Sequence, residues 1–257
     1  MKLWVLMENT ACREDLAKEH GLSLYLQTGE RHILFDAGQS GAFADNARAM
    51  GVDLERVDTA VLSHGHYDHG GGLMRFLEEN GKAPVYVSAL AFGGHYHEAR
   101  YIGIDAGLKT SPRVIPLEGT RTLGAGITIL PAVPGESPRS GLSVLREDVL
   151  EEDTFLHEQY LLVEEKGKRI LISGCSHRGI VNIAEHFRPD VLIGGFHLVN
   201  LDPAGNRGEL DAIARRLLAL PTVYYTGHCT GQPQFEYLKT RMGDRLQSLS
   251  TGKTLEV

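Results

Sequence analysis

Four potential metal ligands, His64, His66, Asp68 and His69, are crowded into six residues of this chain. They lie in a glycine-rich segment, 63–72, between an apolar run and a predicted helix. His64 and His66, alternate residues of an extended turn, can reach one metal ion, while Asp68 and His69, past the bend, can reach a second. Neutral imidazoles with a carboxylate suit Zn²⁺, with Mn²⁺ or Fe²⁺ as alternatives, better than Ca²⁺ or Mg²⁺. The segment therefore predicts two divalent ions, and the competing interpretation is a histidine-rich surface turn.

Further candidate ligands stand at the ends of other predicted strands. His228 follows an apolar run and is predicted to bind the second ion. Cys175 could bind zinc as a thiolate, but a small buried thiol fits the same pattern. His177 and His157 are alternatives for the third ligand of the first ion. We rank His177 first, because it lies two residues past Cys175 at a strand end that should face the same cavity.

His197 follows two glycines at the end of another predicted strand. Glycine permits close approach of the backbone to a ligand. His197 is therefore predicted to be catalytic, as a contact to the substrate or transition state, with a core histidine as the alternative. The remaining histidines with a predicted surface role are His32, His95, His97 and His186.

The predicted elements recur in the same order in two segments, at about 20–104 and about 156–230. Each segment has a hairpin, a short helix, a buried strand, a second helix and a last strand. In the first segment these elements are predicted, in that order, at 22–35, 42–50, 59–63, 72–79 and 84–88. In the second they are predicted at 159–173, 179–187, 190–193, 208–219 and 222–226. A duplicated unit implies two sheets packed face to face with helices outside. We therefore predict a single α/β domain over 1–257, a four-layer αββα sandwich whose loops converge on one site.

Two segments fall outside this repeat. Residues from about 105 to 155 are rich in Gly, Pro, Arg and Glu, and we interpret them as a linker that also forms part of a substrate wall. A mobile surface loop is the alternative. The N-terminal residues 1–8 are predicted to form an edge or surface strand.

Composition excludes several classes of protein. The chain has 257 residues, 42% of them hydrophobic, and a formal net charge of −7 without a basic stripe, so nucleic acid is not a favoured partner. The longest apolar runs are too short to span a membrane. Three cysteines without a CxxC pair favour a reduced, cytoplasmic protein. The oligomeric state is left open.

The pattern HxHxDH after a strand resembles the signature of the metallo-β-lactamase superfamily. The segments 19–23, 34–39, 173–182, 194–198 and 225–231 are similar to the branch that includes 7,8-dihydropterin-6-yl-methyl-4-(β-D-ribofuranosyl)aminobenzene 5′-phosphate synthases. The resemblance implies that Asp36 is a buried aspartate behind the ligands rather than a ligand. It also brings Asn9 and His20 near the substrate. Candidate anchors for a substrate phosphate are Lys109, Arg139 and Arg178.

This resemblance implies a metal-dependent hydrolase of a small-molecule phosphoester or acyl bond. Two ions would share a water and lower its pKa, Asp68 would orient the resulting hydroxide, and His197 would steady the developing oxyanion. A second hypothesis keeps the fold but predicts a metal-assisted condensation of a pterin diphosphate with an aminobenzene riboside phosphate. A third predicts a ligand-binding or signalling protein with little turnover.

Overall fold

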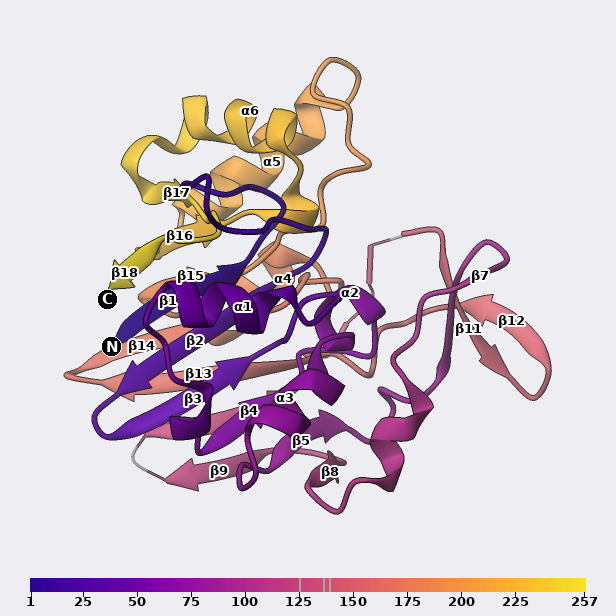
Figure 1. Cartoon of the computed structure of the whole chain (residues 1–257). Helices are drawn as coiled ribbons and strands as arrows, with labels where there is room; N and C mark the ends of the chain where they lie inside the picture. The colour runs from indigo at the N-terminus through magenta and orange to yellow at the C-terminus, as the bar shows by residue number, and fades with distance from the viewer. Residues whose placement is uncertain (125, 136, 139) are drawn as a thin grey trace.

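The computed structural model describes residues 1–257 except 125, 136 and 139. Two seven-stranded sheets form its centre (Figure 1). The first contains, in spatial order, β18 (Thr254–Glu256), β1 (Lys2–Met7), β2 (Ser23–Thr28), β3 (Arg31–Phe35), β4 (Thr59–Val61), β5 (Val85–Ser88) and β8 (Val114–Leu117). The second contains β17 (Leu246–Ser248), β16 (Val223–Thr226), β15 (Val191–Ile193), β14 (Lys168–Ile172), β13 (Gln159–Glu165), β10 (Ile127–Pro131) and β9 (Arg121–Gly124).

The two sheets repeat one pairing pattern. In the first, β2 pairs antiparallel with β3, and β3, β4 and β5 are parallel. In the second, β13 pairs antiparallel with β14, and β14, β15 and β16 are parallel. Parallel strands of one sheet end at the same edge, so the loops after β14, β15 and β16 lie together. The two sheets pack face to face, which brings the loop after β4 to these loops.

Helices cover the outer faces of both sheets. The first carries α1 (Ala42–Ala49) and α3 (Leu73–Glu79), and the second carries α4 (Ile180–Phe187), α5 (Arg207–Leu218) and α6 (Gln232–Met242). Shorter helical turns are α2 (Tyr67–Gly70), η1 (Leu54–Arg56), η2 (Ala106–Thr110), η3 (His228–Thr230) and η4 (Gly243–Arg245). No helix in the described ranges is both long enough and apolar enough to cross a bilayer.

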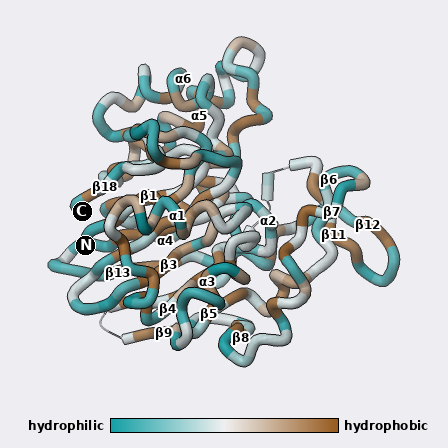
Figure 2. Tube along the Cα trace, viewed as in Figure 1, coloured by the Kyte–Doolittle hydropathy of each residue, from teal (hydrophilic) through white to brown (hydrophobic). Residues whose placement is uncertain are grey.

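Side-chain alternation along the strands creates the layers. Leu24 and Leu26 of β2 face the core between the sheets, while Tyr25 faces the core under α1 and α3. Leu161 of β13 likewise faces the central core, while Leu162 faces α4 and α5. In Figure 2 the apolar stretches lie along these strands and the inner helix faces. The predicted four-layer αββα sandwich is confirmed, while its interpretation as one domain of two related halves stays a prediction.

Three predictions about elements need correction. The N-terminal strand β1 is not an edge strand, because β18 pairs with it on one side and β2 on the other. The strand at 222–226 is not the last, because β17 and β18 follow it. The segment 105–155 is more than a linker, because it supplies β8, β9 and β10 to the two sheets.

The same segment also supplies two of the four strands of a third, smaller sheet. Its four strands are β12 (Val149–Glu152), β11 (Leu142–Arg146), β6 (Gly94–His97) and β7 (Arg100–Tyr101). This sheet projects from the sandwich beside α2, at the right of Figure 1. It brings residues 94–101 next to residues 142–152, which are distant in sequence.

Candidate metal centre

The loop after β4 places its histidines by a tight passage of the backbone. A Cβ at Gly65 would lie 2.0 Å from the carbonyl oxygen of Ala91, so only glycine fits between His64 and His66. His66 has extended backbone angles and precedes the short helix α2, which carries Asp68 and His69. The loop therefore turns these side chains toward the ends of β14 and β16.

His64, His66 and His177 form a first group of potential ligands, with one donor atom of each within 4.8 Å of the others. His64 Nε2 and both nitrogens of His177 are buried without a hydrogen-bond partner in the described structure. The ring of Phe155 stacks on that of His177 at 4.2 Å between centroids, and Glu158 accepts a hydrogen bond of 2.7 Å from the His177 backbone N–H. Three buried imidazoles, each with Nε2 lacking a partner in the described structure, fit a divalent cation.

Asp68, His69, Cys175 and His228 form a second group. The Nε2 atoms of His69 and His228 lie 3.1 Å apart, and Cys175 Sγ lies 3.1 Å from His69 Nε2. Asp68 Oδ2 is 3.2 Å from His228 Nε2. Two imidazole nitrogens so close repel each other unless a proton or a cation lies between them, so this group also fits a metal ion.

Asp36 lies behind both groups and fixes their ring orientations. Its Oδ2 accepts hydrogen bonds from His69 Nδ1 at 2.6 Å and from the Ser63 hydroxyl at 2.7 Å. The Ser63 oxygen then accepts from His64 Nδ1 at 2.7 Å. Both rings are left with Nε2 free for a cation. The side chain of Asn9 does the same for His228, accepting from its Nδ1 at 2.9 Å.

Burial lowers the pKa of His64, His66 and His177 well below the ordinary value for histidine, which keeps these rings in the neutral form that binds metals. His69 differs. Burial lowers its pKa, but the Asp36 and Asp68 carboxylates outweigh that effect and raise it to about 9. A cation entering the second group must therefore displace a proton from His69 at neutral pH.

We expect the affinity of the second ion to depend on pH for this reason. It should rise at least about tenfold per pH unit between pH 7 and 9, because below the raised pKa of His69 the ion must displace a proton from this ring. The affinity of the first ion should stay nearly constant over this range. Competition titrations with a chromophoric chelator measure both, and a flat profile for both ions would contradict this role of His69.

A cavity of about 570 Å³ opens beside the two groups. His66, Asp68, Cys175, His177 and His228 line it, so both groups face it. Predicted substrate contacts on its wall are Asn9, His20 and His197. His20 is half exposed, with Nε2 3.3 Å from Asp68 Oδ2. His197 packs against His177, with 4.2 Å between ring centroids, and has a donor atom within 4.8 Å of Cys175 and Cys229.

Two of the three predicted phosphate anchors lie elsewhere. Arg178 is buried, and its guanidinium donates hydrogen bonds to the carbonyls of Val133, Gly135 and Thr154, so it links these backbone segments rather than facing the cavity. Lys109 borders a different cavity. Arg139 lies outside the described residues. Among the described residues, Arg100 is the one arginine or lysine that lines the cavity of the metal centre.

Other histidines are placed differently from the prediction. His157 does not join His64 and His177, but lies with His66, His95 and Asp153. His95 and His32 are buried rather than on the surface, because Asp153 binds the first and the Tyr25 hydroxyl the second. His97 and His186 are exposed, as predicted.

Sequence reasoning missed several buried groups of this region. They are Glu8, which accepts from the His228 backbone N–H at 2.5 Å, together with Asp153, Glu158 and Cys229. Glu158 carried a usable signal, since it stands at the start of an apolar strand. Asp153 carried none, because it falls in the segment interpreted as a linker.

The comparisons with known proteins agree with this arrangement. The family model of the metallo-beta-lactamase superfamily matches residues 18–228. An uncharacterized protein of Methanocaldococcus jannaschii, MJ0448, is 33% identical, with 88% of this chain and 90% of that protein covered. From the same organism, 7,8-dihydropterin-6-methyl-4-(beta-D-ribofuranosyl)-aminobenzene-5'-phosphate synthase is 27% identical, covering 100% of this chain and 96% of the synthase.

Solved structures give the same result. The crystal structure of Tm1679, described as a metal-dependent hydrolase of the beta-lactamase superfamily, has a TM-score of 0.85 at 31% identity and covers 100% of this chain and 99% of its own. Zn²⁺-bound PqqB from Methylobacterium extorquens shares the fold, with a TM-score of 0.61 at 16% identity and full coverage of both chains. The ligand-bearing loops and the paired sheets agree with these matches, and the matches show that the chain belongs to the metallo-beta-lactamase superfamily.

Proposed function

We propose that this chain is a metal-dependent hydrolase that cleaves a phosphoester or acyl bond of a small molecule. One observation carries the proposal: both groups of potential ligands face the same cavity, through His66 and His177 on one side and Asp68 and His228 on the other. Donors that served only stability would not need to border a space large enough for a substrate.

Two divalent ions, Zn²⁺ first and Mn²⁺ or Fe²⁺ as alternatives, fit these groups. His64, His66 and His177 would hold one, and Asp68, His69, Cys175 and His228 the other. Burial raises the pKa of Cys175, so its thiolate depends on a nearby cation. When bound, the ions would supply Lewis acidity and a water that ionises near neutral pH.

The side chains around the ions have separable roles in this proposal. Burial raises the pKa of Asp68, but His69, His20 and His228 lower it well below its ordinary value, so Asp68 is a carboxylate that orients a water and accepts its hydrogen bond. His20, half exposed and next to Asp68, can pass a proton to solvent. His197 borders the cavity and can donate to an oxygen that becomes negative.

Arg100 is the proposed anchor for an anionic substrate. It is exposed and lies over the ring of Tyr67, with 5.1 Å from guanidinium carbon to ring centroid. We expect Arg100→Ala to raise KM for a phosphorylated substrate at least about tenfold with little change in kcat, as loss of a charged hydrogen bond does. Arg146→Ala, an exposed arginine of the same small sheet, is the control. Equal KM values in all three proteins would contradict this role.

The proposed hydrolysis is tested by metal analysis joined to a substrate screen. The protein is loaded with Zn²⁺ or Mn²⁺ and offered aryl phosphate monoesters, phosphodiesters and carboxylic esters. Turnover of one class, with more than one ion per chain, would support the proposal. An inactive protein that binds ions and ligands would instead favour the signalling or binding hypothesis.

A condensing synthase is the second candidate, because the relative with that printed activity matches over the full length of this chain. In that reaction the ions would assist the departure of diphosphate, so release of diphosphate from a pterin diphosphate distinguishes it from hydrolysis. The free cysteines of the described structure agree with a proposed cytoplasmic location.

A further inference from the structure

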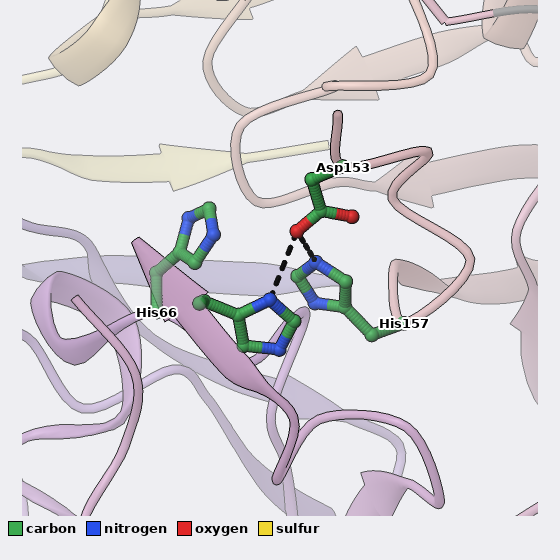
Figure 3. A group of neighbouring side chains, drawn as sticks. His66, Asp153 and His157 are labelled. Carbon is green, nitrogen blue, oxygen red and sulfur yellow. Dashed lines mark hydrogen bonds and ion pairs between the residues drawn. The ribbon is translucent and has the colours of Figure 1, made fainter. Parts of the chain in front are cut away.

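A second buried carboxylate, Asp153, supports the metal-binding loop at a residue other than those that Asp36 contacts. It directly follows β12 of the small third sheet, and His95 comes from β6 of that sheet. His157 precedes β13. All three side chains are buried, and the role proposed for the two ions uses none of them. Figure 3 shows the Asp153 carboxylate directed at His157, with His66 at the opposite edge of the group.

Asp153 accepts hydrogen bonds with both carboxylate oxygens. Its Oδ2 accepts from His95 Nδ1 at 2.9 Å and from His157 Nε2 at 3.2 Å. Its Oδ1 accepts from the Phe155 backbone N–H at 2.7 Å. A carboxylate can accept hydrogen bonds from all three donors. In an asparagine, the NH2 group would face at least one of these N–H donors and could not accept from it.

The donors and acceptors around His157 argue against a metal ion at this position, although the four donor atoms lie within 4.8 Å of one another. The backbone N–H of Gly65 donates to His157 Nδ1 at 2.9 Å. A neutral His157 must therefore carry its hydrogen on Nε2, which points it at Asp153 rather than offering a lone pair to a cation. Asp153 and His157 therefore satisfy each other through hydrogen bonds.

Each branch of this network leads to the first group of potential ligands. Through His157, Asp153 fixes Gly65, the residue between His64 and His66. Through Phe155, it fixes the ring that stacks on His177. Through His95, it aligns a ring that lies 5.5 Å from that of His66, edge to face, and both rings have a buried Nε2 without a partner in the described structure.

We propose that Asp153 is a positioning residue for the first metal ion, acting through His157, His95 and Phe155. This inference rests on the proposed metal centre. Asp36 is connected to His64 and His69, and Asp153 is connected to His66 and His177. Outer partners of metal ligands typically change metal affinity 10–100-fold when they are replaced.

The test compares Asp153→Asn with the parent in titrations with Zn²⁺ and Co²⁺. Asparagine keeps the side-chain volume, but its NH2 group replaces one of the two accepting oxygens. We therefore expect the first ion to bind roughly 10–100-fold more weakly. The second ion should be unaffected. Its group includes Cys175, so the thiolate-to-cobalt absorption band reports on it separately. A general loss of structure would weaken both ions together.

Asp105→Asn is the matched control. Asp105 accepts from the backbone N–H of Gly107, two residues on, at 2.7 Å, as Asp153 does from Phe155, but it is exposed at the start of η2. It should bind both ions like the parent. His157→Ala is a second variant, to be used if circular dichroism shows that Asp153→Asn does not fold. It removes the link from Asp153 to Gly65, so it should also weaken binding of the first ion.

Three results would overturn the inference. Unchanged affinity for both ions in Asp153→Asn and His157→Ala would remove the positioning role. Loss of an ion beyond the two would make Asp153 itself a ligand. A parent protein that binds no ion would overturn the proposed metal centre together with this inference, whereas the first two results leave that centre standing.

Discussion

Asp68→Ala should reduce turnover by on the order of 10³-fold while the protein remains folded, within the range contributed by a positioned acid or base. The reason is its place among the donors: Asp68 Oδ2 lies 3.2 Å from His228 Nε2, 3.3 Å from His20 Nε2 and 3.6 Å from His69 Nε2. No neighbouring carboxylate in the described second group can replace it. Steady-state kinetics with the substrate class found in the screen measure the effect.

Asp45→Ala is the control for this experiment. Asp45 is an exposed aspartate of α1 that pairs only at the surface with Arg48, so its loss should leave both turnover and metal content unchanged. Asp68→Ala should also lower the occupancy of the second ion. A rate within tenfold of the parent, with the second ion lost, would show that Asp68 holds metal but does not take part in turnover.

The parts of the fold that could be predicted are those with a local signal. The hairpin β2–β3 could be predicted because Leu24, Leu26, Ile33 and Phe35 alternate around a glycine turn. The strand β18 could not, because its partner β1 lies at the other end of the chain. Pairing over such a distance leaves no periodic pattern near either strand.

The candidate site divides in the same way. The cluster at His64–His69 is dense enough in sequence to predict ligands, and repetition of the βαβ order brought His177 and His228 to the same edge. The supporting carboxylates Glu8, Glu158 and Asp153 were not predicted to belong to the site, because an isolated acidic residue in a sequence is usually exposed to solvent. Glu8 and Glu158 accept from backbone N–H groups of the ligand loops, and Asp153 accepts from His95, and tertiary structure alone brings these partners together.

Replacement of Asp36 should have the second large effect, a loss of metal affinity, because this one carboxylate orients ligands of both ions. In Asp36→Asn the amide would place an N–H against the hydrogens of Ser63 or His69, since Oδ1 accepts from the Ser63 backbone and Oδ2 from the Ser63 hydroxyl and His69 Nδ1. We expect both ions to bind roughly 10–100-fold more weakly, by the usual size of such effects on metal affinity. Titration with Co²⁺ separates them, because the thiolate band from Cys175 follows the second ion.

Ser63→Ala is the matched variant, because it removes one branch of the same network. Its hydroxyl connects Asp36 to His64 Nδ1 but makes no hydrogen bond to His69 in the described structure, and His69 has its own bond of 2.6 Å to Asp36. Only the first ion should weaken, and the cobalt–thiolate band should persist at parental affinity. If Ser63→Ala weakened both ions equally, or if Asp36→Asn spared the second, then Asp36 would be stabilising the loop as a whole rather than setting the free nitrogen of each ring.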